Sequence, residues 1–506
     1  MQSTLTPEFE SQPIVIVPQL HPAANLHEKI YEAGVHYNLT ERKGEPCMDN
    51  WDSNHVRMPC SPKSLYPINK ERDLEKRWTL IMNSLNREIN DFQDLKQAVL
   101  KYNSAFKKRR GWNFEGLEAL LETEGSDRDG ENHHEFQNTE NTKKSAYSEY
   151  SNQFFSSTLP FILNLVKNTS EILNTPIPLA KSQSPITVTL SQYQCACILA
   201  NSFLCTWSRR NKTTPGHEYE NFPFINFNCL FSVNEPWVKN KLKCLIHYFE
   251  RVKSRVDKKF KFGNVTFQRK KLDQEDLDKN WSKMDADFDK SITGDVEAFV
   301  LGNSEPIEDY PNSLQADFAN KFLGGGVLNS GCVQEEIRFM VCPELIVGML
   351  FQEKMTNNES ILITGAEQYS EYSGYSNTFT FAGAHYDKLN RDLGQRLQIQ
   401  ITAIDAVDMY ELRKTNEQFS RQIVLREVNK VYCGIKSEKK TASVEKLPGF
   451  ATGNWGCGAF GGTPHLKFLQ QLMACSKAGR DMTYCCFDSP ELQIELEWMY
   501  SSLVIS

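Results

Sequence analysis

The chain has 506 residues, of which 40% are hydrophobic and 24% are charged, and its formal net charge is -7. These values are near the averages for globular domains, so they exclude a wholly disordered or fibrous protein and leave room for two or three packed units. The negative net charge argues against binding of nucleic acid over the whole surface. No direct DNA binding is therefore expected.

The longest apolar runs are too short for a membrane span. The run from Cys195 to Trp207 is interrupted by Asn201 and Ser202 and falls well below the roughly 20 residues that a membrane helix needs. The first ten residues contain no basic segment followed by an apolar core, so no secretory or mitochondrial signal is expected. We expect an intracellular protein, nuclear or cytoplasmic, that makes no contact with membranes.

Neither the cysteines nor the acidic clusters indicate a metal site. The 14 cysteines are scattered and form no C-x-x-C pair, which favours buried free thiols. Asp285, Asp287 and Asp289 resemble the start of a calcium loop, but Lys290 stands where that loop requires glycine. We therefore expect an exposed acidic surface there, with no metal and no cofactor in the protein.

The first half of the chain reads as an extended arm followed by helices. Residues 1–70 are irregular and rich in proline. From Arg77 to Val252 the apolar residues recur at helical spacing, and Ser191 with Gln194 forms a plausible capping box before a helix. The segment Glu122–Lys144 has few apolar residues, which predicts a polar loop between helices.

After Gly263 strands alternate with helical segments, which is typical of an α/β domain. The expected strands are Val265–Arg269, Ser360–Thr364, Leu397–Ala403 and Thr483–Phe487. The expected helices between them are Cys332–Leu350, Phe419–Tyr432 and Leu466–Ala478.

A glycine-rich turn and a pair of acids carry the densest chemistry in the sequence. Gly324, Gly325 and Gly326 permit positive φ and leave backbone amides uncovered, as a diphosphate held close to the chain requires. After seven intervening residues, Gln334, Glu335 and Glu336 fall in the first turn of a predicted helix. Adjacent helix positions point roughly 100° apart, so these two acids must have different roles. A flexible turn and simple partners for the helix dipole remain the alternatives.

Two other features of the sequence point to ligand binding. Asp317 and Asn320 lie just before the glycines and are able to hold a ligand hydroxyl or an acidic side chain, or merely to form a local turn. Gly456 to Gly461 satisfies G-x-G-x-x-G before a predicted helix, which fits a bound diphosphate and leaves a dinucleotide-dependent oxidoreductase open as an alternative.

Three glycines, seven residues and then Gln334-Glu335-Glu336 form a pattern that is similar to the signature of the poly(ADP-ribose) glycohydrolases. Further segments resemble that family in the same order along the chain, so the resemblance covers roughly Trp51 to Glu495. These segments are His55–Cys60, Leu65–Pro67, Pro176–Leu179, Thr364–Tyr375 and Ala451–Gly462.

The resemblance implies an α/β fold, a three-layer α/β/α macrodomain with a mixed sheet, preceded by an α-helical accessory domain. We expect an N-terminal arm at 1–70, the helical domain at 71–262 and the macrodomain-like catalytic domain at 263–506. The implied activity is hydrolysis of ribose–ribose O-glycosidic bonds in poly(ADP-ribose), with release of ADP-ribose. The polymer and poly(ADP-ribosyl)ated proteins are the implied partners, in the DNA damage response.

The resemblance also implies a role for each matching residue. Glu336 matches the catalytic acid/base, which protonates the departing ribose oxygen and then activates water. Glu335, Asp317 and Asn320 match residues that orient the ribose at the bond being cut. The implied substrate-binding residues are Ile307, Glu308, Gly324, Gly325, Gly326, Gln334, Tyr372, Tyr375, Asn454, Gly456, Gly458, Phe460 and Phe487. Among these, Glu308 contacts adenine and Tyr375 closes over the ligand.

A general acid needs a raised pKa, whereas a helix N-terminus lowers the pKa of a carboxyl. Burial, a second carboxyl and the substrate diphosphate are expected to offset the helix. A non-catalytic ADP-ribose reader is the principal alternative function, because macrodomains often only bind.

Overall fold

The computed structural model describes residues 35–40, 51–67, 73–109, 111–123, 149–210, 216–273, 296–302, 305–410, 416–437 and 447–505. The expected polar loop from residue 124 onward lies outside these ranges, as does the acidic segment Asp285–Asp289.

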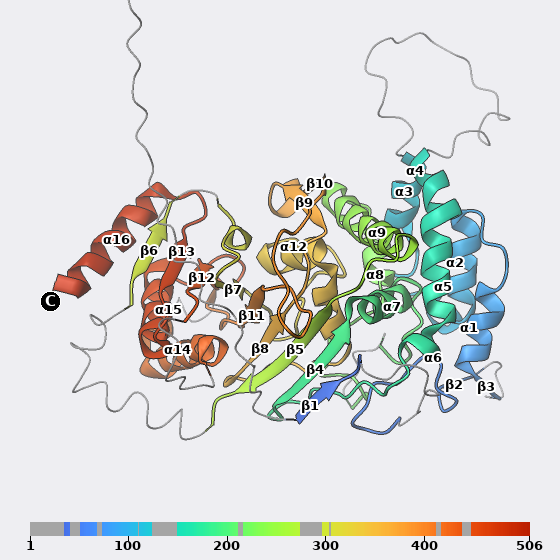
Figure 1. The fold of residues 1–506 in the computed structure, drawn as a ribbon, viewed down its shortest axis with the longest axis horizontal. Helices are drawn as coiled ribbons and strands as arrows, with labels where there is room; N and C mark the ends of the chain where they lie inside the picture. The colour runs from blue at the N-terminus through green and yellow to red at the C-terminus, as the bar shows by residue number, and fades with distance from the viewer. Residues whose placement is uncertain are drawn as a thin grey trace, which may run out of the picture.

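A mixed sheet of nine strands runs through the described part of the chain (Figure 1). Strands β11, β7, β12, β13 and β6 are parallel to one another, while β4, β5, β8 and β11 alternate in direction. In spatial order the strands are β1 (Val35–Asn38), β4 (Ile186–Ser191), β5 (Asn264–Lys271), β8 (Glu359–Thr364), β11 (Gln400–Ala403), β7 (Leu314–Asp317), β12 (Phe450–Gly453), β13 (Met482–Cys485) and β6 (Ala298–Leu301).

Helices cover both faces of this sheet, which gives the expected three layers. On one face, Phe267 and Ile363 belong to a core that includes residues of α7 (Gln192–Phe203), α9 (Pro236–Asp257) and α12 (Gln334–Val341). On the other face, Leu314 and Phe450 belong to a second core with α14 (Arg421–Ile435) and α15 (Pro464–Ala478). Burial of apolar side chains on both faces is the main driving force for this arrangement.

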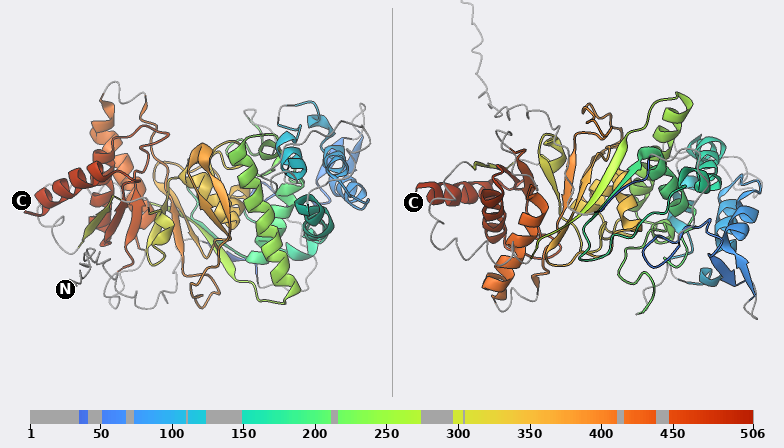
Figure 2. Two further views of the ribbon diagram at one scale, coloured as in Figure 1. Left: turned by 90° about the horizontal axis from the view of Figure 1, so that it is seen from above. Right: turned by 60° about the horizontal axis from the view of Figure 1, so that its bottom comes forward.

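The remaining helices lie toward the two ends of the molecule (Figures 1 and 2). Helix α16 (Pro490–Ile505) lies beside β6 at one end. The blue and green helices gather at the other end: α1 (Arg77–Leu85), α2 (Phe92–Lys101), α3 (Glu115–Thr123), α4 (Glu149–Gln153), α5 (Leu159–Lys167), α6 (Thr169–Ile172) and α8 (Asn228–Phe231). Two small antiparallel pairs are β2 (Leu65–Pro67) with β3 (Leu74–Lys76) and β9 (Ser370–Ser373) with β10 (Thr380–Ala384).

Local sequence signals explain where several helices begin and end. The predicted capping box of Ser191 and Gln194 is confirmed at the start of α7. Helix α15 begins with Pro464 and ends at Ala478, and the next residue, Gly479, has a φ of 65° that suits a glycine C-cap. The helix expected over Cys332–Leu350 was wrong in its second half. It ends at Val341 because Pro343 follows, and residues Pro343–Leu350 form a 3-10 helix.

The expected strands are present with shorter bounds in two cases. The strand expected at Leu397–Ala403 begins only at Gln400. The strand expected at Thr483–Phe487 ends at Cys485, because the chain turns sharply and Phe487 and Asp488 both have a φ of 55°.

The two strands β1 and β4 lie before residue 263 in the sequence, yet they extend the same sheet. Strand β4 pairs along its whole length with β5, from Ile186 opposite Arg269 to Ser191 opposite Asn264. Strand β1 adds to the outer edge of β4. The sheet is therefore shared across the domain boundary that the sequence analysis places at residue 263.

Parallel strands β7, β11, β12 and β13 end at one edge of the sheet. In sheets of this kind, ligands bind outside the carboxyl ends of the strands. The loops that follow these strands begin at Phe318, Ile404, Asn454 and Cys486, and they contain most of the predicted site residues.

Among the helices described here, none combines the length and the apolar character that crossing a bilayer requires.

A fragment that starts at Gly263 should not fold independently. It would lack β4, leaving the hydrogen-bonding edge of β5 unpaired, and it would lose α7 and α9 from one face of the sheet. We expect an insoluble or molten product, measured by expression yield, near-UV circular dichroism and thermal unfolding. A soluble fragment with a cooperative melting transition would contradict this expectation.

Candidate active site

The glycine turn after β7 folds around the side chain of Glu335. The Oε2 atom of Glu335 accepts a hydrogen bond from the Asn320 amide at 2.8 Å, and Oε1 accepts from the Gly324 amide at 2.6 Å. Glu335 is buried, with 3% of its surface exposed. Burial, followed by the nearby carboxyls of Asp317 and Glu336, raises the pKa of Glu335 well above its usual range, against the opposing effect of the two amides.

Glu336 binds a different part of the same loop. Its Oε1 atom accepts from the Gly326 amide at 2.8 Å, and its Oε2 atom accepts from the Val333 amide at 2.9 Å. The second bond satisfies an amide at the start of α12, which is half of a capping box. The two adjacent acids thus point to different loop segments, as their helical spacing predicts.

The glycines are required because the carboxylates occupy the space that side chains would need. A Cβ on Gly325, where φ is 48°, would lie 2.7 Å from Glu335 Oε2 and 2.7 Å from Glu336 Oε1. A Cβ on Gly331 would lie 2.8 Å from the Gly326 Cα and 3.0 Å from Glu336 Oε1. Positions 325 and 331 therefore require glycine for the loop to pack against the acidic first turn of α12.

Asp317, the last residue of β7, lies beside these two acids without a hydrogen-bond partner. Its side chain is fully buried, and within the described residues neither of its oxygens accepts a hydrogen bond. Burial and the negative charge of Glu336 raise the pKa of Asp317 well above its usual range, opposed by Arg338. An unpaired buried carboxyl costs stability, so its retention is typical of a functional site.

Asn320 and Gln334 have structural contacts in this site. The Asn320 side chain accepts from the Phe322 amide at 3.0 Å. The Gln334 side chain accepts from the Phe318 amide at 2.8 Å and donates to the Ala316 carbonyl at 3.1 Å. Both ends of the Gln334 amide are therefore bonded to the backbone that leaves β7, which makes Gln334 a support for the loop in this structure.

Two further predicted site residues, Glu308 and Tyr372, are hydrogen-bonded to each other. The Tyr372 hydroxyl donates to Glu308 at 2.6 Å, and burial followed by that carboxylate raises the pKa of Tyr372. Glu308 follows Ile307 in a short 3-10 helix (Ile307–Asp309) before β7, and Ile307 is buried. The hydrogen bond joins two segments that are 64 residues apart in the sequence.

Tyr375 and Phe487 lie against each other, with ring centroids 4.7 Å apart. The Tyr375 hydroxyl accepts from the Gln334 amide at 3.2 Å, which brings its ring beside the first turn of α12. Phe487 is 59% exposed and lies in the sharp turn after β13. An exposed aromatic ring on a constrained turn is typical of a surface that packs against a ligand.

The second glycine loop lies between β12 and α15, which is the strand–loop–helix context that both the diphosphate and the dinucleotide interpretations require. Asn454 joins the ends of two strands, because its side chain donates to the Cys486 carbonyl at 3.1 Å and accepts from the Tyr484 hydroxyl at 3.0 Å. Gly456 has a φ of 73°, and at Gly458 a Cβ would meet no atom within 4 Å. Phe460 is half-buried against the second core.

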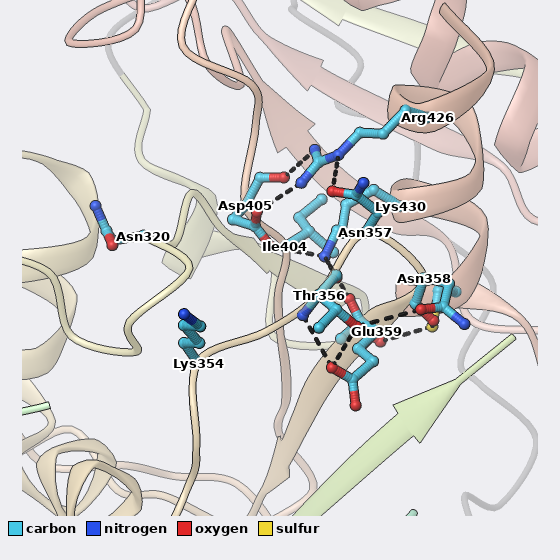
Figure 3. Close-up of polar contacts among 12 residues, drawn as sticks. Asn320, Lys354, Thr356, Asn357, Asn358, Glu359, Ile404, Asp405, Arg426 and Lys430 are labelled. Carbon is cyan, nitrogen blue, oxygen red and sulfur yellow. Dashed lines mark hydrogen bonds and ion pairs between the residues drawn. The ribbon is translucent and has the colours of Figure 1, made fainter. Parts of the chain in front are cut away.

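A buried ionic network, missed by the sequence analysis, holds the loop after β11 (Figure 3). Asp405 accepts from Arg426 at 2.6 Å and from Lys430 at 2.6 Å, and Lys430 also donates to the carbonyls of Thr356 and Glu359 at 2.6 and 2.7 Å. The sequence contained a signal for this network: an acid stands two residues after the strand, and the two cations lie four residues apart on one helix.

In the described part of the chain, no group of three or more His, Cys, Asp or Glu side chains is arranged to hold a metal ion.

Replacement of Asp317 by asparagine should stabilise the fold above neutral pH. Because the folded-state pKa of Asp317 is raised, the wild-type carboxyl is most compatible with folding below its unfolded pKa, and this stability is lost as the pH rises through the folded pKa. The asparagine of Asp317→Asn does not ionise, so the variant does not lose this stability. We expect its free energy of unfolding to exceed that of the wild type by about 1 kcal/mol or more at pH 8. The difference between the two proteins should shrink toward pH 5. Urea unfolding at both pH values measures it.

Asp273→Asn is the matched control, because Asp273 is exposed after β5. A gain for Asp317→Asn that is absent, or equal at both pH values, would contradict the raised pKa.

Two models of one known protein family match this chain. Residues 279–494 match the family model of the poly(ADP-ribose) glycohydrolase macro domain fold, and residues 147–269 match the model of the helical domain of the same family. The first model covers the sites of Glu335 and Glu336 and both glycine loops.

Similar proteins carry the same family name. The chain is 35% identical to poly(ADP-ribose) glycohydrolase 1 of Arabidopsis thaliana over 376 residues, which covers 61% of this chain and 65% of the relative. It is 36% identical to poly(ADP-ribose) glycohydrolase 1 of Caenorhabditis elegans over 315 residues, covering 60% of this chain and 36% of that protein. The matches thus span less than two thirds of the length of either relative.

Among solved structures, the chain is similar to poly(ADP-ribose) glycohydrolase from Deinococcus radiodurans in complex with ADP-ribose, with 14% identity and a TM-score of 0.26, covering 47% of this chain and 95% of that one. The expected macrodomain fold preceded by a helical domain is confirmed by the two family models. Since these models match successive parts of the chain in the order helical domain, then macrodomain, the chain belongs to the poly(ADP-ribose) glycohydrolase family.

Proposed function

We propose that this chain hydrolyses the ribose–ribose O-glycosidic bonds of poly(ADP-ribose) and releases ADP-ribose, with Glu336 as general acid/base. The observation that carries the proposal is the buried pair Glu335 and Glu336, which lies beside the unpaired carboxyl of Asp317. Each acid is bound by one backbone amide of the glycine turn and by one further amide of the loop between β7 and α12. The family assignment supports the same activity.

In this proposal Glu336 serves in both chemical steps. As an acid it gives its proton to the glycosidic oxygen that leaves, while the ribose carbon develops oxocarbenium character. As a carboxylate it then takes a proton from water, whose oxygen bonds to that carbon. The amides of Gly326 and Val333 hold the carboxyl in one orientation, so little reorganisation is needed between the steps.

The neighbouring acids are proposed to position the ribose. Asp317 offers two free acceptor oxygens to a ribose hydroxyl, since neither is bonded within the described part of the chain. Glu335 supports the glycine turn through two amides and lies next to Asn320, which the family resemblance assigns to the same ribose. The structure adds Gln334 as a support for this loop.

The rest of the substrate is proposed to bind along the carboxyl edge of the sheet. Glu308, linked to Tyr372, would contact adenine, and the ring pair of Tyr375 and Phe487 would pack on the nucleotide. The glycines of the two loops would receive the diphosphate through backbone amides. Residues 71–262 would form the accessory helical domain, and the partners would be proteins that carry the polymer in the nucleus or cytoplasm.

Glu336→Gln should abolish turnover and leave the affinity for ADP-ribose within a few fold. General acid/base groups contribute about 10²–10⁴-fold to rate, and one residue that serves both steps contributes more. Release of ADP-ribose from labelled polymer measures the rate, and calorimetry measures the affinity. A variant that keeps a tenth of the wild-type rate would remove Glu336 from this role, whereas a wild-type chain that binds without turnover would favour the reader.

Gly325→Ala should eliminate activity by displacing both acids. The new Cβ would approach each carboxylate to 2.7 Å, so the loop and the first turn of α12 must separate. Gly479→Ala is the matched control, because its φ of 65° imposes a similar backbone cost while no atom lies within 4 Å of the new Cβ. We expect both variants to lose about 1 kcal/mol of stability from the backbone, with polymer turnover lost only in Gly325→Ala. Equal turnover in the two variants would disprove the steric argument.

A further inference from the structure

A lysine of the helical domain is buried beneath the glycine turn. Lys241 lies on α9, and none of its surface is exposed. Its ammonium donates to the Asn329 carbonyl at 2.8 Å and to the Gly331 carbonyl at 2.6 Å. Lysine is almost never fully buried without partners, and here the partners are backbone atoms of the loop that leads into α12.

A second side chain of α9 binds the carbonyl between these two. The Trp237 indole nitrogen donates to the Ser330 carbonyl at 3.0 Å. Three successive carbonyls, those of Asn329, Ser330 and Gly331, therefore accept hydrogen bonds from one turn of a single helix. Such repeated contact fixes the turn in position relative to α9 more firmly than one hydrogen bond could.

The turn Asn329–Gly331, which α9 holds, packs against Gly326, whose amide binds Glu336. Asn329 donates through its amide to the Gly326 carbonyl at 3.0 Å, and its side chain accepts from the Gly331 amide at 3.1 Å. Gly331 packs so closely on Gly326 that a Cβ there would lie 2.8 Å from the Gly326 Cα. Gly326 in turn donates to Glu336 Oε1 at 2.8 Å.

The charge of Lys241 also acts at this site. Burial lowers the pKa of Lys241 to about 8, an effect opposed by the nearby Cys332, Glu336 and Cys244. The two carbonyls accept the hydrogen bonds that a buried ammonium needs, and an apolar side chain at position 241 would remove both bonds to the turn.

We propose that α9, through Lys241 and Trp237, is the positioning element for the general acid/base: it holds the Asn329–Gly331 turn and thereby fixes the Gly326 amide against Glu336. This inference rests on the proposed function. The helical domain then contributes directly to the rate of the chemical step. Because the adenine-side residues Glu308 and Tyr372 lie on other segments, loss of the turn contacts should lower kcat far more than substrate affinity.

The test is Lys241→Met, which keeps most of the apolar stem and removes the donor. We expect kcat for release of ADP-ribose from labelled polymer to fall at least tenfold, with KM and the Kd for ADP-ribose within threefold of wild type. Lys239→Met is the matched control, because Lys239 lies on the same helix and is partly exposed, and it should retain wild-type kcat. Thermal unfolding of each variant is recorded on the same samples.

The proposal is overturned if Lys241→Met keeps kcat within twofold, or if kcat, KM and Kd all worsen together with a lower Tm, since that pattern is general loosening. If Lys241→Met does not fold, Trp237→Phe decides: it removes the donor to Ser330 from a partly exposed position. A fall in kcat of at least threefold at unchanged Kd supports the positioning role, and an unchanged kcat overturns it. Absence of turnover in the wild-type chain counts against the proposed function itself.

Discussion

Two adjacent carboxylates bound by four backbone amides are the constraint on which the rest of this site depends. Glu335 and Glu336 each accept hydrogen bonds from two N–H groups, and all four of these groups belong to the loop between β7 and α12. Buried carboxylates need such donors, and each of these two acids receives one of them from a glycine of the turn. The glycines are therefore part of the acid geometry, and Gly325 has no room for even a methyl group.

This arrangement has an energetic cost that the surrounding structure offsets. Asp317 stays buried and unpaired next to the two acids, whereas the buried carboxylate of Asp405 is paired with Arg426 and Lys430. The two buried carboxyls therefore have different roles. Asp405, which is paired, fixes a loop, and Asp317, which is unpaired, is available to a ligand. The buried apolar residues of the two cores, on either side of the sheet, offset the stability that is lost at the unpaired carboxyl.

Much of the site was predictable because its parts are local in sequence. Gly324–Gly326 and the Gln334–Glu336 helix start lie within one short segment, and helix geometry alone separates the directions of Glu335 and Glu336. Periodicity also predicted the α/β alternation, but not the pairing of β4 with β5 across the expected domain boundary, since strand order depends on long-range contacts. Lys241 was missed although it falls on the apolar side of its helix, between Val238 and Leu245, because its carbonyl partners are about 90 residues away.

The central claim is that this geometry cleaves glycosidic bonds instead of only holding ADP-ribose. The most direct measurement is a time course of the wild-type chain with radiolabelled poly(ADP-ribose), carried out with and without excess chelator, with products separated by chromatography. The account predicts steady accumulation of free ADP-ribose at the same rate in both reactions. Polymer that is bound but remains intact, or cleavage that stops with chelator and returns with a divalent ion, would contradict it.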